Sequence, residues 1–182
     1  MKALLIVDMQ SWMFRKSERA EQLTTLLPVI DSLVEKFERT SLPIFNVVTE
    51  HGADRSTWSR LMLKYDYSCL IEGSDDAGAV DGFSVPPSAD RLVKRANSAF
   101  LDTNLDERLK SKGITHLVLS GVFIDGCVGL TAADAAQRGY EVTFVEDAIG
   151  HTETKWRSTL YDWLADDYEI EIVNGEDLML SD

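Results

Sequence analysis

The sequence predicts an α/β protein with a three-layer αβα, Rossmann-like fold around a central, mostly parallel sheet of about six strands. Strand-like apolar runs alternate with helical patterns along the chain, which is typical of parallel βαβ units. Hydrophobic residues make up 45% of the 182 positions, enough for a sizeable core. No internal repeat or interdomain linker is visible, so we expect a single domain over residues 1–182.

The expected elements follow one another in order. A strand at 3–7 leads into an amphipathic helix whose apolar positions are Leu26, Leu27, Ile30, Leu33, Val34 and Phe37. Pro28 limits this helix, either as an early-turn residue or as a kink. The later elements are strands at 44–48, 92–93, 117–119, 142–145 and 170–173 and helices at 105–109, 130–137 and 156–164.

Residues 50–90 form a long stretch without a regular pattern. It contains several glycines and the pair Pro86-Pro87. So long a loop-rich insert in a small domain is more often functional than filler. We therefore expect this insert to contribute to a binding site.

The segment from Gly121 to Val128 is the first candidate for chemistry. An apolar strand ends at Gly121, and a helix is expected to begin at or beside Cys127. Free N–H groups and the positive end of the helix dipole favour a thiolate there and can hold an oxyanion. A lone cysteine is more often a small buried hydrophobe, so this segment needs support from elsewhere in the chain.

Two other strand ends carry charged side chains. The run 3–7 ends in Asp8, and the strand at 92–93 ends in Lys94. In open α/β sheets the ligand crevice lies beyond the carboxyl ends of the strands, where such residues meet. Taken singly, Asp8 is better interpreted as a turn residue and Lys94 as a solvated surface charge. A carboxylate, an ammonium and a thiol at three strand ends together favour a site.

These segments resemble the isochorismatase-like cysteine hydrolase family over nearly the whole chain. The matching motifs are Leu5 to Gln10, Lys94 to Phe100, Gly121 to Val128 with the following Thr131-Ala132 and Asp134-Ala135, and Val145 to Ala148. The resemblance implies a catalytic triad of Asp8, Lys94 and Cys127. It also implies an oxyanion hole from the N–H groups of Phe123 and Cys127, with a cis peptide at Val122-Phe123.

The triad implies hydrolysis of an amide or ureide-type C–N bond of a small molecule. Asp8 takes the thiol proton, Cys127 forms a thioester, and Lys94 stabilises charge near the carbonyl. One alternative is isochorismatase-type enol-ether hydrolysis, in which the aspartate acts as general acid and no nucleophile is needed. Another is a non-catalytic small-molecule-binding protein of the same fold.

No metal ion and no other cofactor are expected. Nicotinamidases of the superfamily hold zinc with an Asp-x-His motif and a further histidine. Here the corresponding piece is Thr49-Glu50-His51, which lacks the carboxylate in its first position. The other two histidines, His116 and His151, do not complete a zinc set of three or four ligands. His51 remains a candidate for the pocket wall or for a surface loop.

Several loop residues are candidates for contacts with substrate. Gln10 is a plausible polar contact to Asp8 or to substrate, and Phe14, Trp58 and Phe100 are aromatic candidates around the pocket. Asp125 is interpreted as a turn residue. Other residues are expected to have no chemical role: Cys69 as an inert thiol, and Trp156 and Trp163 as core or subunit contacts.

The net charge of −13 argues against nucleic acid and anionic membranes as partners. No apolar run approaches membrane-spanning length, and Met1-Lys2 leads directly into a strand rather than a signal peptide. The two cysteines do not make a disulfide framework, and a reactive thiol needs a reducing compartment. We therefore expect a cytoplasmic homo-oligomer that acts on a small molecule.

Overall fold

The computed structural model describes residues 1–180. Six parallel strands form one sheet in the order β3-β2-β1-β4-β5-β6. The strands are β1 (Lys2–Val7), β2 (Ile44–Thr49), β3 (Asp90–Lys94), β4 (His116–Gly121), β5 (Glu141–Ile149) and β6 (Glu171–Val173). The predicted αβα fold with about six mostly parallel strands is confirmed.

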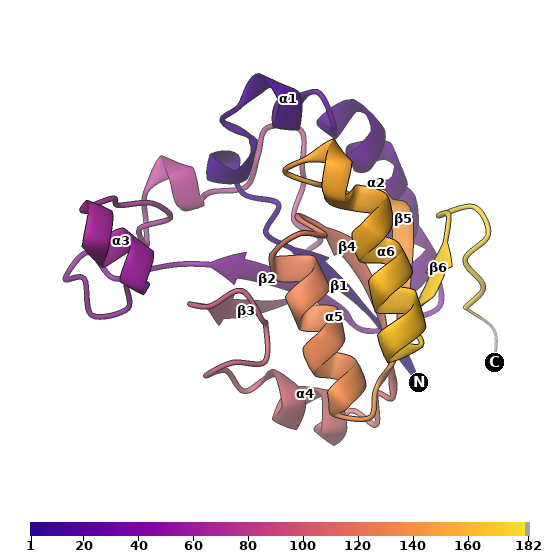
Figure 1. Ribbon diagram of the computed structural model, residues 1–182. Helices are drawn as coiled ribbons and strands as arrows, with labels where there is room; N and C mark the ends of the chain where they lie inside the picture. The colour runs from indigo at the N-terminus through magenta and orange to yellow at the C-terminus, as the bar shows by residue number, and fades with distance from the viewer. Residues whose placement is uncertain (181–182) are drawn as a thin grey trace.

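Helices cover both faces of this sheet (Figure 1). The helices are α1 (Ser17–Ala20), α2 (Leu23–Arg39), α3 (Arg60–Tyr65), α4 (Leu105–Ser111), α5 (Cys127–Gln137) and α6 (Thr154–Tyr168), with 3-10 turns η1 (Ser11–Phe14) and η2 (Asp75–Ala77). On one face α2 packs its apolar stripe against the sheet, and on the other face lie α4, α5 and α6. Pro28 lies inside α2, in its second turn.

Strand β1 lies between β2 and β4, and both of its faces are buried. Leu5 and Val7 point into the core beneath α4 and α5, whereas Leu4 and Ile6 point toward α2. Such a strand reads as a continuous apolar run rather than as an alternating one. The chain first builds outward from β1 to β3 and then returns to place β4 on the other side of β1, which creates a topological switch point between β1 and β4.

Gly121 allows β4 to end close against β1. Its φ of +100° is open mainly to glycine, and a Cβ built there would lie 2.1 Å from the carbonyl oxygen of Val7. No residue with a side chain fits this approach. The glycine therefore fixes where the chain leaves β4 and turns toward α5.

Most of the predicted elements are shorter than the observed ones, although β6 is one residue shorter than predicted. Strand β5 runs to Ile149 rather than to residue 145, and α6 extends from Thr154 to Tyr168 rather than over 156–164. On α6, Trp156 is 53% and Trp163 44% exposed, so these residues are not in the core, and a subunit contact stays a prediction.

The irregular segment 50–90 lies beyond the carboxyl end of β2 (Figure 1). It contains α3 and η2 and returns to the sheet through isolated bridges, Gln10 with Ala79 and His51 with Ile71. Its position places it over the strand ends at which the sequence predicted chemistry.

Candidate active site

Three strand ends bring Asp8, Lys94 and Cys127 together. The Lys94 ammonium lies 2.8 Å from Asp8 Oδ2 and 3.2 Å from Cys127 Sγ. Asp8 follows β1, Lys94 ends β3, and Cys127 begins α5 after β4. The Asp8 and Lys94 side chains are fully buried. Each offsets the desolvation of the other, since an isolated charge at this depth is costly.

Thr49, which stands where the zinc motif has its carboxylate, is part of the same network. It ends β2, which lies between β1 and β3. Its hydroxyl donates to Asp8 Oδ1 at 2.9 Å and accepts from Lys94 Nζ at 2.7 Å. The Lys94 side chain therefore reaches Asp8 across the end of β2, with a small hydroxyl residue as the bridge.

Gln10 holds the Thr49 backbone rather than facing the cavity. Its Nε2 donates to Thr49 O at 2.9 Å and to Ala77 O at 2.8 Å, and its Oε1 accepts from Thr49 N at 2.8 Å. The amide group is thus fully engaged and buried. It ties the ends of β1 and β2 to the insert, which is a positioning role rather than the predicted contact with substrate.

Burial and the neighbouring Asp8 carboxylate raise the pKa of the Cys127 thiol to about 12, against the opposing effect of Lys94. The prediction of a lowered pKa is therefore wrong. It considered the helix start and the ammonium but not the desolvation of the sulfur. At neutral pH the resting residue is a thiol, and a thiolate forms only when a base takes its proton.

The Lys94 ammonium stays charged in this setting. Burial opposes its charge, but Asp8 and the Cys127 sulfur beside it outweigh that effect and raise the pKa of Lys94 above its ordinary value. A buried lysine without such partners would lose its proton. The site thus holds a fixed positive charge next to the sulfur.

Two backbone N–H groups beside the sulfur are available to a ligand. Among residues 1–180, neither the Phe123 nor the Cys127 N–H donates to another group of the protein. The Val122-Phe123 peptide is cis. The N–H groups in the first turn of a helix have no partner within the helix. A ligand carbonyl oxygen at this position can therefore accept hydrogen bonds from the protein backbone.

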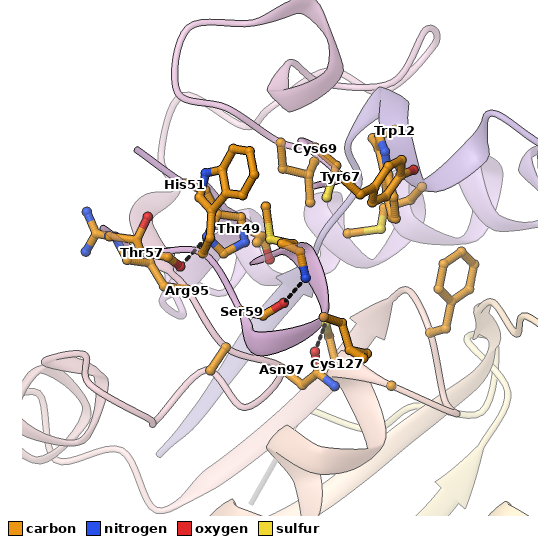
Figure 2. A pocket seen from close by; sticks show the side chains of 18 of the residues that line it. Trp12, Thr49, His51, Thr57, Ser59, Tyr67, Cys69, Arg95, Asn97 and Cys127 are labelled. Atoms are coloured by element: carbon orange, nitrogen blue, oxygen red, sulfur yellow. Dashed lines mark hydrogen bonds between the residues drawn. The ribbon is translucent and has the colours of Figure 1, made fainter. Parts of the chain in front are cut away.

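A cavity of about 1200 Å³ opens in front of Cys127. Figure 2 shows Cys127 beside Asn97, with His51 and Thr57 from the insert on one side and Trp12 and Tyr67 on the other. The insert thus supplies much of the wall. A cavity of this size is large enough for a small organic molecule.

Of the aromatic residues predicted to contact substrate, Trp58 lines the cavity, and its Nε1 donates to Gly52 O. Phe14 is buried against Phe123, with ring centroids 6.3 Å apart, and Phe100 is buried against Tyr140 in the opposite core. Neither Phe14 nor Phe100 lines the cavity. Both therefore support the site from behind.

The three histidines lie in different parts of the fold. His51 lines the cavity with Nδ1 2.8 Å from Thr57 O, and burial lowers its pKa. His116 contacts Thr143 and Glu141, and His151 contacts Thr154. Within the described part of the chain, no three metal-binding side chains converge.

Asp125 and Cys69 make different kinds of contact around the site. Asp125 accepts from the Thr152 N–H and hydroxyl, so it fixes the loop after β5 against the turn before α5. Cys69 lines the same cavity as Cys127, and burial raises the pKa of its thiol.

None of the helices in the part of the chain that the structure describes has the length and apolarity needed to cross a membrane.

Relatives and solved structures share this architecture. The chain is 31% identical over 147 residues to the secreted isochorismatase effector Isc1 of Verticillium dahliae, covering 81% of this chain and 71% of the relative. It is 31% identical to a probable inactive nicotinamidase of Arabidopsis thaliana, covering 80% and 79%. N-carbamoylsarcosine amidase of Thermoplasma acidophilum superposes with a TM-score of 0.82 at 26% identity, covering 99% of each chain.

A family model for the isochorismatase domain matches residues 2–172. That span includes the six strands, except for the last residue of β6, and also Asp8, Lys94 and Cys127. With the relatives that share at least 30% identity over most of their length, this match identifies the chain as a member of the isochorismatase family of hydrolases.

Proposed function

We propose that this protein hydrolyses an amide or ureide-type C–N bond of a small molecule through a Cys127 thioester. One observation carries the proposal. A protonated thiol, a buried carboxylate and a fixed ammonium meet within ion-pair distance at the base of a cavity that also presents two free N–H groups. This is the set of groups that nucleophilic acyl transfer requires.

Acylation begins with transfer of the Cys127 proton to Asp8. The sulfur then bonds to the substrate carbonyl carbon, and the carbonyl oxygen becomes an oxyanion held by the Phe123 and Cys127 N–H groups. Asp8 next gives its proton to the departing nitrogen as the C–N bond breaks. An amine or ammonia leaves, and the acyl group remains on sulfur as a thioester.

Deacylation uses the same groups in reverse. Asp8 takes a proton from a water molecule as that water attacks the thioester carbonyl carbon. The oxyanion re-forms at the two N–H groups and collapses, the C–S bond breaks, and the sulfur regains the proton from Asp8. Throughout the cycle Lys94 balances the charge that moves between Asp8 and sulfur, while Thr49 holds both partners.

The relatives support hydrolysis, but their names refer to different reactions. The Thermoplasma protein is named as an amidase, which acts on a C–N bond, and it covers the whole chain. The Verticillium relative is named as an isochorismatase, and this name favours enol-ether hydrolysis as the second candidate. In that reaction Asp8 is the general acid and Cys127 has no bond to form.

A substrate screen with matched variants separates the two candidates. Small amides, ureides and isochorismate are incubated with the wild-type protein, and released ammonia and pyruvate are measured. We expect ammonia from at least one amide, lost in Cys127→Ala and in Asp8→Asn but retained in Cys69→Ala. Pyruvate release that survives Cys127→Ala would establish the second candidate instead. Absence of turnover on all compounds, with a folded protein, would favour the binding-protein alternative.

We further propose that the protein works as a homo-oligomer in a reducing, cytoplasmic compartment. Both cysteines are free, and the mechanism needs Cys127 as a thiol. Because the Verticillium relative is named as secreted, localisation of the tagged chain in its own cells is the decisive test. Light scattering of the purified protein gives the oligomeric state.

A further inference from the structure

The charges that line the cavity have the opposite sign to those of the chain. The protein has 31 acidic and 18 basic residues. Among residues 1–180, the ionised side chains that line the cavity are three arginines, Arg15, Arg19 and Arg95, and one carboxylate, Asp102. The net charge of −13 repels anions from the protein as a whole. The arginines around the cavity attract anions to this one place.

These arginines also lack the partners that arginines have elsewhere in the fold. Of the ten arginines in the sequence, five form ion pairs. Arg15, Arg19 and Arg95 have no carboxylate within ion-pair distance among residues 1–180. Asp125, Glu153 and Glu18 lie farther from Arg19 and offset only part of the lowering of its pKa by burial and by Arg15. Three of the five unpaired arginines thus surround one cavity.

Arg19 lines the same cavity as Cys127 and packs on the side chain of Phe123. Its guanidinium carbon is 4.8 Å from the centroid of the Phe123 ring, and the backbone N–H of Phe123 is one of the two oxyanion donors. Its Nε is buried without a hydrogen-bond partner in the described part of the chain. A buried guanidinium N–H without an acceptor is costly, and an acceptor supplied by a ligand removes that cost.

Arg15 presents a second guanidinium to the same cavity. It stacks on the Trp12 ring at 3.5 Å and donates from Nη1 to Trp12 O at 2.9 Å, which fixes its orientation and leaves its other N–H groups free. Burial and the like charge of Arg15 lower the pKa of Arg19. Two like charges four residues apart repel each other unless an anion lies between them.

We propose that Arg15 and Arg19 form a carboxylate subsite, so that the substrate is an amide or ureide that also carries a carboxylate group. This inference rests on the proposed function for the position of the C–N bond and on the two arginines for the anion. The planar arginine fork matches the two oxygens of a carboxylate. With the carboxylate held near Phe123, the carbonyl of the same molecule is directed to Cys127.

The test compares anionic amides with their neutral counterparts. Succinamate, glutaramate and maleamate are paired with butyramide, valeramide and (Z)-crotonamide, in which a methyl group stands in place of the carboxylate. Ammonia release gives kcat/KM for each compound. The readout is the ratio of anionic to neutral kcat/KM, because a general disturbance of the oxyanion hole would lower both rates and leave their ratio unchanged.

We expect Arg19→Gln to lower this ratio about 10–100-fold, the loss typical of one charge-assisted hydrogen bond. Arg19→Lys, which keeps the charge but not the fork, restores part of it. The matched control is Arg39→Gln, an unpaired arginine at the far end of α2, which leaves the ratio as in the wild type. Equal losses on both kinds of amide in Arg19→Gln would overturn the carboxylate subsite while leaving amide hydrolysis in place.

A binding measurement keeps the two proposals apart. In the Cys127→Ala background, calorimetric titration with succinamate and butyramide reports recognition without turnover. Stronger binding of succinamate that is lost in Arg19→Gln supports the subsite even if no amide is hydrolysed by the wild-type protein. Equal affinity for the two compounds, or an affinity for succinamate that Arg19→Gln leaves unchanged, refutes the subsite.

Discussion

Replacing Asp8 with asparagine is expected to stop turnover and, at the same time, to make Cys127 more reactive toward alkylating agents. The amide keeps the volume of the carboxylate and tolerates the left-handed backbone of this position, where φ is 54°. It cannot accept the thiol proton, so acylation falls by at least roughly 10²–10⁴. It also removes the negative charge that helps to keep the sulfur protonated.

The size of the second effect follows from the geometry. Lys94 Nζ lies 2.8 Å from Asp8 Oδ2 and 3.2 Å from Cys127 Sγ, so the carboxylate and the sulfur are no more than about 6 Å apart. Two unit charges at about 6 Å and an effective dielectric constant of about 20 interact by about 3 kcal/mol. Without the carboxylate, the thiolate population at neutral pH rises about a hundredfold. The less basic thiolate is a weaker nucleophile, which leaves roughly a tenfold gain in rate.

Iodoacetamide labelling followed by mass spectrometry of the two cysteine peptides measures this gain. In the wild type, labelling of Cys127 should rise about tenfold per pH unit between pH 7 and 10, because the reactive thiolate forms only as pH approaches the raised pKa of about 12. Asp8→Asn should label faster at pH 7, whereas the control Asp102→Asn, which removes an exposed carboxylate at the cavity, should not. Rapid wild-type labelling at pH 7, or no gain in Asp8→Asn, would refute this account of the resting thiol.

Three further predictions concern the same site. Lys94→Ala should abolish turnover and lower the free energy of unfolding by roughly 3–5 kcal/mol in chemical denaturation, because it leaves the buried Asp8 carboxylate uncompensated; an unchanged denaturation midpoint would contradict the buried pair. Thr49→Val should lower kcat and destabilise the fold by about 1–3 kcal/mol, because it removes the hydroxyl that joins Asp8 to Lys94, and Thr49→Ser should restore both; equal rates in Thr49→Val and wild type would count against the bridge. Hydrolysis should survive exhaustive chelation, since the three histidines lie apart, and loss of activity that added zinc restores would contradict this.

Much of the fold is predictable because parallel strands buried on both faces are continuous apolar runs. Residues 3–7 and 117–119 were recognised for that reason and lie side by side as β1 and β4. The ends of the elements were less accurate. Strand β5 continues to Ile149 through Glu146 and Asp147, two carboxylates that break the apolar pattern but bind Arg157 and the Gly175 N–H. Such stabilising contacts come from segments distant in sequence.

The candidate site was predictable where a reactive group directly follows an apolar run. Asp8 and Lys94 meet that condition, Cys127 begins the helix that comes after such a run, and the structure places the three within contact distance. Thr49 follows a run as well, but a threonine at a strand end carries no charge that would distinguish it. Its role depends on β2 lying between the strands that carry Asp8 and Lys94, which is a property of strand order.

The residues around the cavity were harder to predict because side-chain direction is set by packing. Phe14 and Phe100 follow the catalytic strand ends in sequence, yet both point into the core, where their apolar rings are more stable. Arg15 and Arg19, in contrast, have no sequence pattern that distinguishes them from other charged residues. Their significance becomes visible only when the carboxylates that would pair with them are found to lie elsewhere.

Because the pKa of Cys127 is raised, the rate of the proposed reaction depends on how the cavity positions a ligand. A thiol whose pKa is about 12 is a poor nucleophile toward molecules that merely diffuse past it. A substrate that places its carbonyl oxygen at the Phe123 and Cys127 N–H groups stabilises the charge formed when sulfur attacks, and this makes proton transfer to Asp8 favourable. Reactivity then depends on how well a ligand is positioned, so groups that anchor its far end, such as Arg19, act on the rate as well as on affinity.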